Sequence, residues 1–265
     1  MQKRPTVFDL SFALSNSDPE PMLQPKIIYQ DHRETAKGFG AAFGLQPEDF
    51  PDSNFAGVET ITLSTHSGTH LDAPWHYGPL SGGRPARTID EMPLEWFFSD
   101  GVVLDFTHKG SGEAITPREM EQALGKIGYT LKPYDIVLVR TDTYKRFSEP
   151  RYDDLHCGVT PEATHWLIDR GIKVMGIDAW GWDPPFTMMV DQVKQGHKEV
   201  LWAAHFVGKE KEYCHIEKLA NLDKLPRPFG FKVAVFPVKI ERASAGWVRA
   251  VAIFEEGPKN SGKAL

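Results

Sequence analysis

A chain of 265 residues with 41% hydrophobic and 25% charged residues has the composition of a globular protein with room for one large domain. Its net charge of −6 argues against nucleic acid as a partner, because phosphate binding needs clustered Lys and Arg. No run of about 18 apolar residues predicts a membrane span. Two cysteines are too few for a disulfide framework. We therefore expect a cytoplasmic protein that acts on a small molecule.

Predicted strands recur along the chain without an internal repeat or a linker. Residues 14–56 are rich in Pro, Asp and Gly and lack periodicity, so we expect a loop, a lid or an arm packed on another subunit. Residues 257–265 are typical of a flexible tail. Apolar runs bounded by Gly, Pro or Asp predict strands at residues 8–11, 58–65, 101–106, 134–141, 172–178, 231–240 and 247–256.

Three segments predict helices. TPREMEQALG (116–125) and TPEATHWLIDRG (160–171) both begin with Thr at the N-cap and Pro at the first helical position, and both end on Gly. Apolar residues at helical spacing predict a third helix within residues 196–206. More strands than helices favour a mixed α/β architecture in a single domain, residues 1–265, over a regular doubly wound sheet.

The segment THSGTHLDAPWH (65–76) holds three of the ten histidines of the chain. On one straight strand, His66 and His76 would lie roughly 33 Å apart, too far to share an ion. A continuous helix is also unfavourable, because Gly68 and Pro74 interrupt it. The segment must therefore turn back on itself if its polar side chains act together.

A turn at Ser67–Gly68 would let His66, His70 and Asp72 converge, since glycine can take a positive φ. The following proline would redirect the chain and place His76 beside them. Two imidazoles and a carboxylate are a usual ligand set for a catalytic divalent ion with an open position for water. The alternative is a group of surface or capping histidines near a turn.

The segment HSGTHLDAPWH (66–76) resembles the H-x-G-T-H-x-D-x-P-x-H signature of the cyclase-like metal-dependent hydrolases, which include bacterial kynurenine formamidases and isatin hydrolases. The resemblance implies a mixed, barrel-like β-sheet flanked by helices, of the swivelling β/β/α type, in a homodimer or higher homo-oligomer. Residues 14–56 match least. Further similarity lies in FDLS (8–11), VMGIDAWGWD (174–183), HIEKLANLDKLP (215–226) and FPVKIERASAGWVRAVAI (236–253).

By this resemblance, His66, His70 and Asp72 would bind a first divalent ion, Zn²⁺ or Mn²⁺. His76 would be the catalytic histidine beside that ion. Asp72 would also suit a bridging role, with its two oxygens shared between ions roughly 3.5–4 Å apart. Members of the family work with one ion or with two, so we expect one or two ions per subunit.

Members with two ions use a later His and, twelve residues on, a Glu. His205 and Glu217 have that spacing, and Glu217 lies in a matching block. The resemblance therefore implies that this pair binds the second ion. The alternatives are a core or capping histidine and a solvated charge. The sequence assigns no role to His215, and it gives no support to a Cys157 nucleophile beside His156, because adjacent residues seldom point at each other.

Four further residues are candidates for substrate binding. Trp75, Trp180 and Trp182 could stack on an aryl group, and Asp178 follows a predicted strand, where loops can carry function. Core packing is the alternative for the tryptophans, and a turn or helix cap for Asp178.

A divalent ion lowers the pKa of its bound water to about 7 and polarises a carbonyl oxygen, and a histidine can move the proton. These features predict hydrolysis of a carbon–nitrogen bond in a small aromatic amide. An aryl formamide such as N-formylkynurenine and a cyclic amide such as isatin both fit. A metal-dependent cyclase or lyase, and a metal-binding protein without catalysis, remain as alternatives.

Overall fold

The computed structural model describes residues 4–19 and 23–255, so the predicted flexible tail, 257–265, lies outside the described residues. The chain divides into two compact units. We call residues 14–64 the arm unit and the rest of the chain the core unit. The predicted arm, 14–56, falls inside the arm unit, and its role as an arm or lid stays a prediction.

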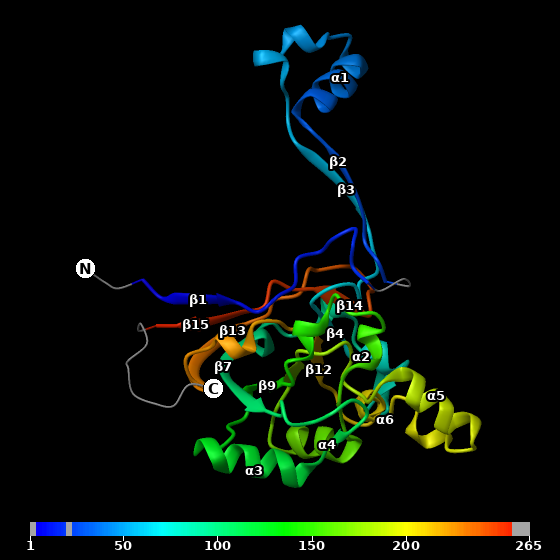
Figure 1. Ribbon diagram of the computed structural model, residues 1–265, viewed down its shortest axis with the longest axis vertical. Coiled ribbons are helices and arrows are strands. Elements are labelled where there is room, and N and C mark those ends of the chain that lie inside the picture. Colours follow the sequence, from blue (N-terminus) through cyan, green and yellow to red (C-terminus); the bar gives the residue numbers. More distant parts are fainter. Residues whose placement is uncertain (1–3, 20–22, 256–265) are drawn as a thin grey trace. The chain divides into compact units, whose positions relative to one another are not determined.

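Among the described residues, nine strands of the core unit form one sheet that curls like part of a barrel (Figure 1). The pairs β7–β9, β9–β11 and β11–β12 are parallel, and the other pairs are antiparallel. The expected mixed, barrel-like sheet flanked by helices is therefore confirmed. In spatial order the strands are β1 (Thr6–Asp9), β15 (Val251–Phe254), β13 (Phe229–Ala234), β7 (Phe98–Asp105), β9 (Ile136–Arg140), β11 (Val174–Ile177), β12 (Cys214–Glu217), β4 (His70–Asp72) and β14 (Ala245–Trp247).

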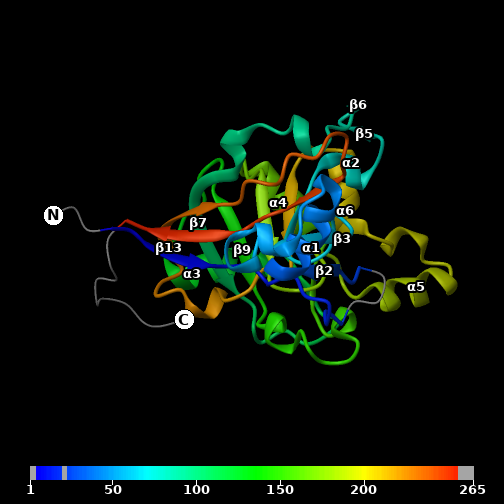
Figure 2. The same ribbon diagram turned by 90° about the horizontal axis from the view of Figure 1, so that it is seen from above.

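Both faces of this sheet are covered by apolar core. Successive side chains of a strand point to opposite faces, so Val102 and Leu104 of β7 join one cluster while Val103 joins the other. Helices α3 (Pro117–Ile127) and α4 (Pro161–Asp169) contribute to the first cluster and lie together along one side of the core unit (Figure 1). Figure 2 shows β13 and β7 side by side in the same sheet.

The helix start signals are confirmed, whereas one stop signal is wrong. Thr116 caps α3, forming a capping box with Glu119, and Thr160 caps α4. Helix α3 does not end at Gly125. It continues to Ile127 and ends against Gly128, whose φ of 68° and backbone N–H bond to the carbonyl of Gly125 form a left-handed cap.

The third predicted helix, 196–206, is broken. It consists of a short 3-10 turn, Lys198–Val200, and α6 (Ala203–Phe206). Trp202 lies between them with a φ of 51°, a conformation that no continuous right-handed helix contains. Helix α5 (Phe186–Lys194), which follows Pro185, was not predicted. The apolar spacing within 196–206 therefore reflects packing of two short turns.

The remaining elements are short. Predicted strand 231–240 ends early, at Ala234, and predicted strand 247–256 divides between β14 and β15. The short helix α2 (Pro74–Tyr77) follows β4, and the small strands are β5 (Leu80–Ser81), β6 (Arg84–Pro85), β8 (Ala114–Ile115) and β10 (Gly158–Val159). Other 3-10 turns cover Pro47–Asp49, Pro51–Ser53, Ile89–Glu91, Leu94–Phe97, Thr143–Arg146, Tyr152–Asp154, Val207–Lys209 and Leu222–Lys224.

The arm unit is a two-stranded ribbon with a helix. Strands β2 (Lys26–Gln30) and β3 (Val58–Thr62) pair antiparallel, so the predicted strand 58–65 belongs to the arm unit and not to the main sheet. The ribbon leads to α1 (His32–Phe43), which Asp31 caps (Figure 1). Phe39 of α1 stacks on Phe55 at 4.7 Å between ring centroids.

Both cysteines are buried, and burial raises the pKa of the Cys157 thiol to about 12 and that of Cys214 well above its usual value. We expect neither thiol of the native protein to react with Ellman's reagent at mildly alkaline pH, and both to react after unfolding in guanidinium. Rapid titration of a thiol in the native protein would contradict this packing.

Across residues 4–19 and 23–255, no helix has the length and apolar character needed to cross a membrane.

Candidate metal centre

The site is built on two neighbouring strands. In the antiparallel pairing of β4 with β12, Asp72 lies opposite His215 and His70 lies opposite Glu217. Residues two apart on a strand share a face, so these four polar side chains point to the same side of the sheet. Leu71, between His70 and Asp72, points into the core on the opposite face, and so does Ile216, between His215 and Glu217. The register between β4 and β12 therefore positions these four side chains of the site.

The turn before β4 adds a further histidine. The chain turns and bends over residues 65–69, where Gly68 has a φ of 60°, as predicted for this turn. His66 Nδ1 then lies 3.0 Å from Asp72 Oδ1, and His70 Nδ1 donates to the carbonyl of Gly68. The structure thus brings His66, His70 and Asp72 together.

The two oxygens of Asp72 face different histidines. Oδ1 lies 3.0 Å from His66 Nδ1 and 3.3 Å from His70 Nε2. Oδ2 faces three Nε2 atoms, those of His215 at 3.1 Å, His76 at 3.6 Å and His205 at 4.0 Å. The carboxylate therefore lies between two sets of imidazoles.

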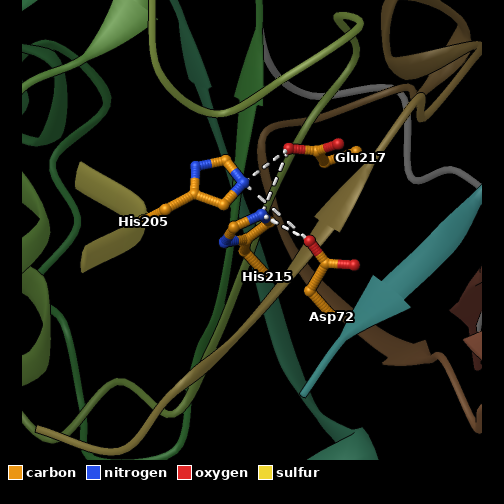
Figure 3. Close-up of side chains that lie close together, drawn as sticks. All are labelled: Asp72, His205, His215 and Glu217. Atoms are coloured by element: carbon orange, nitrogen blue, oxygen red, sulfur yellow. Dashed lines mark hydrogen bonds and ion pairs between the residues drawn. The ribbon is translucent and has the colours of Figure 1, made fainter. Parts of the chain in front are cut away.

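Glu217 lies between the same sets. Its Oε2 is 3.6 Å from His70 Nε2. Its Oε1 is 3.2 Å from His215 Nε2 and 3.4 Å from His205 Nε2 (Figure 3). We call His66 and His70 the first pair and His205 and His215 the second pair. Asp72 and Glu217 each present one oxygen to each pair, the arrangement of two bridging carboxylates.

The donor set fits divalent cations. Both oxygens of Asp72 and Nε2 of His70 are buried without a hydrogen-bond partner in the described part of the chain. Buried polar atoms without partners are rare and need an explanation. A cation among carboxylate oxygens and imidazole nitrogens would satisfy them, and this mixed N/O set suits Zn²⁺ or Mn²⁺.

The electrostatics also favour a cation. Burial works against the charge of Asp72, but the imidazoles around it hold the pKa of Asp72 well below its usual range. Burial likewise opposes the charge of Glu217, and hydrogen bonds from His205 and His215 keep its pKa well below normal. Both carboxylates are therefore ionised at neutral pH. Burial also opposes the charge of His205, yet Asp183 and Glu217 raise the pKa of His205 to about 10. His205 must therefore lose its Nε2 proton before that nitrogen can bind a cation.

Asp183 orients His205, a role that sequence reasoning missed. Its Oδ2 accepts hydrogen bonds from Nδ1 and the backbone N–H of His205, and its Oδ1 accepts from the N–H of Ala204 at 2.7 Å. A neutral His205 that donates from Nδ1 presents the lone pair of Nε2 to the cluster. This carboxylate–histidine pairing is the usual support of a metal ligand.

We expect Asp183→Asn to weaken metal affinity by about 10–100-fold, because the amide cannot accept all three hydrogen bonds that hold His205. Competition with a coloured chelator measures the affinity. The matched control is Asp169→Asn, since Asp169 is exposed and contacts Lys211 at the surface. Equal affinities in the two variants would remove Asp183 from this role.

His76 lies on α2, which Pro74 begins. Its ring centroid is 4.2 Å from that of His66 and 5.4 Å from that of Trp202. Burial lowers the pKa of His76 to about 4, with His66 and His205 acting in the same direction and Asp72 opposing them. The imidazole is therefore neutral at neutral pH and can accept a proton. Its side chain is 18% exposed, so the site is open beside it.

The four predicted substrate-binding residues differ in exposure. Trp75 is 45% exposed and Trp180 is half-buried, with Lys218 Nζ 5.6 Å from its ring. Trp182 is fully buried, and its indole N–H donates to Thr164.

Asp178 is also fully buried. It accepts hydrogen bonds from the backbone N–H of Thr141 and of Asp142 and from the Thr141 hydroxyl, and so ties the ends of β9 and β11 together. Trp182 and Asp178 thus have packing roles, and substrate contact stays a prediction for all four candidates.

Sequence reasoning also missed His215 and Trp202. His215 is fully buried at the centre of the site, and Trp202 stacks on His205 with 4.9 Å between ring centroids. The only available signal for His215 was its spacing, two residues before Glu217, which puts both side chains on one face of a strand. Trp202 offered no signal, because its contact depends on the positive φ that breaks the predicted helix.

The curled mixed sheet and the two carboxylates flanked by histidine pairs define an α/β protein with a candidate dinuclear metal centre. Residues 8–184 match the family described as putative cyclase. A kynurenine formamidase from Paracidovorax citrulli (strain AAC00-1) is 30% identical over 194 residues, covering 73% of this chain and 78% of that protein. The chain belongs to this putative cyclase family.

Solved structures share the fold. An isatin hydrolase bound to the product analogue thioisatinate has a TM-score of 0.72 at 23% identity, covering 94% of this chain and 92% of that chain. Isatin hydrolase A from Ralstonia solanacearum has a TM-score of 0.72 at 24% identity, with coverage of 94% and 92%. Isatin hydrolase A from Labrenzia aggregata, bound to benzyl benzoate, has a TM-score of 0.69 at 24% identity, with coverage of 95% and 94%.

Proposed function

We propose that the protein is a metal-dependent hydrolase that cleaves the carbon–nitrogen bond of a small aromatic amide. The observation that carries this proposal is the pair of buried carboxylates, Asp72 and Glu217, each placed between two pairs of histidines. His66, His70 and Asp72 would hold one divalent ion. Asp72, His205 and Glu217 would hold a second ion.

When bound, such ions lower the pKa of water and polarise a carbonyl oxygen. His76 supplies the proton transfer. Its neutral imidazole lies beside the first pair and is partly exposed, so it can accept a proton from water and deliver it to the leaving nitrogen. Trp202, 5.4 Å from His76 between ring centroids, offers an aromatic wall next to that histidine.

The relatives narrow the substrate class. The kynurenine formamidase is named for an aryl formamide, and the solved isatin hydrolases are named for a fused cyclic amide. Both substrates present an aryl group and an amide carbonyl. By resemblance to the family, His205 and Glu217 favour a formamide substrate, whereas the long segment 14–56 and the Trp-rich WGWD (180–183) favour a cyclic amide.

The test is an assay of metal-reconstituted protein against N-formylkynurenine, isatin and a simple aryl ester. We expect turnover of one of the two amides that depends on added Zn²⁺ or Mn²⁺ and stops with a chelator. Metal-independent turnover, or cleavage of the ester alone, would contradict an amide hydrolase.

A metal-dependent cyclase or lyase is the second candidate, since the family is described as putative cyclase and one solved relative is described as a potential hydrolase with cyclase activity. A lyase consumes no water. Turnover in isotopically labelled water therefore separates the two candidates, because only hydrolysis places labelled oxygen in the product.

A further inference from the structure

His215 forms the second pair together with His205. It is fully buried on β12, directly across from Asp72 on β4. Its Nε2 lies 3.1 Å from Asp72 Oδ2 and 3.2 Å from Glu217 Oε1. These are the same two oxygens that His205 Nε2 faces (Figure 3). One ligand atom from each of the four residues lies within 4.8 Å of the others.

The ring of His215 is held so that Nε2 stays aimed at this point. It stacks with Tyr77 at an interplanar angle of 27° and with Trp182 at 17°. On its other edge, Nδ1 lies 3.3 Å from the hydroxyl of Tyr213. That hydroxyl donates its only hydrogen to the carbonyl of Ala204, so toward His215 it can only accept. Nδ1 can therefore carry the proton and leave a lone pair on Nε2.

The alternative role for His215 is a hydrogen-bond donor. With its proton on Nε2, His215 would donate to Glu217 Oε1, and the Tyr77 hydroxyl, 3.2 Å from Nδ1, would donate to Nδ1. This arrangement suits the protein without metal. Once a cation lies among the four residues, the Nε2 proton would point at a positive charge, so the other tautomer must take over.

We propose that His215 is a fourth protein ligand of the second ion, together with Asp72, His205 and Glu217. This inference rests on the proposed metal-dependent function and deepens it. Four protein ligands complete a tetrahedral shell, which is typical of ions that leave no position open for water. The second ion would then stabilise Asp72 and Glu217, and the first side would be left for substrate and water.

Exposure supports this division between the two ions. On the second side, the side chains of His205 and His215 are 4% and 0% exposed. On the first side, His70 is 1% exposed but His66 is 19% exposed. Solvent therefore reaches the first side, where a position for water is needed. The second ion should bind more tightly and exchange more slowly than the first.

The test is a calorimetric titration of metal-free protein with Co²⁺, followed also by visible absorption. We expect the wild-type protein to take up two equivalents, with the tighter ion showing the intense bands of a four-coordinate site. In His215→Leu, the affinity for the tighter ion should fall by more than the ~10–100-fold that loss of an outer hydrogen-bond partner costs, and its bands should weaken.

Tyr213→Phe is the matched control. It removes the hydroxyl that faces Nδ1 of His215 and keeps the aromatic ring, so its loss should stay within ~10–100-fold. A His215→Leu protein that binds Co²⁺ no more weakly than Tyr213→Phe would overturn the ligand role. Failure of the wild-type protein to bind any divalent ion would instead overturn the proposed function.

A measurement on the wild-type protein covers the case in which His215→Leu does not fold. NMR of isotope-labelled histidine nitrogens, recorded during Zn²⁺ titration, reports whether Nε2 carries a proton. The His215 signal is assigned with His215→Gln. We expect the proton to be on Nδ1 when both ions are bound. A proton retained on Nε2 at saturation would overturn the proposal.

Discussion

Replacing Asp72 by alanine is expected to abolish both metal binding and turnover. Its two oxygens face both histidine pairs. Within residues 4–19 and 23–255, the change therefore removes the only side chain whose partners include His66, His70, His205 and His215. Elemental analysis measures metal content after dialysis. A chelator should destabilise wild-type protein by about 4 kcal/mol where free metal had stood near 1,000 times its dissociation constant. The variant should show no chelator effect.

Asp191→Ala is the control for this experiment. Asp191 lies on α5, is 68% exposed at its side chain and contacts Lys194, so the variant should keep wild-type metal content and chelator response. Full metal occupancy in Asp72→Ala would contradict the ligand assignment, whatever its activity.

His76→Ala is expected to keep the metal and lose about 10²–10⁴-fold in rate, the usual contribution of a positioned acid–base group. His76 Nε2 lies 3.6 Å from Asp72 Oδ2, yet the carboxylate has closer imidazole partners in His66, His70 and His215. Loss of His76 should therefore spare binding and remove the proton transfer. Metal content and steady-state kinetics on the same preparation measure both effects.

His165→Ala serves as its control, because His165 lies on α4 and contacts the exposed Glu210. Its rate and metal content should match those of the wild-type protein. If His76→Ala retained full activity, His76 would have no part in the reaction. If it lost its metal, His76 would be a ligand.

Helix starts and the turn at Gly68 could be predicted from neighbouring residues in the sequence alone. The Thr-Pro pairs at 116–117 and 160–161 mark true helix starts, because capping is decided by neighbouring residues. Gly68 likewise marked the turn that brings His66 to Asp72, since a positive φ is a local requirement that glycine meets best. These features needed no knowledge of distant contacts.

Long-range contacts could not be predicted in the same way. His215 enters the site only because β12 pairs with β4 in a register that sets it opposite Asp72, and that pairing joins residues far apart in the chain. Asp183 was missed for the same reason, since its carboxylate meets α6 some twenty residues later. The break at Trp202 arises from tertiary packing that overrides apolar periodicity.

Strands β4 and β12 also carry core residues: Leu71 and Ile216 are fully buried in the apolar cluster beneath the four polar side chains. A slip of one residue between β4 and β12 would exchange the two faces. Core residues would then leave the apolar cluster, and the four polar side chains would no longer lie together. The packing of the core and the arrangement of the polar side chains therefore depend on the same register. The polar side chains are thus preorganised by the apolar interior below them, so we expect metal binding to leave the far-ultraviolet circular dichroism spectrum unchanged.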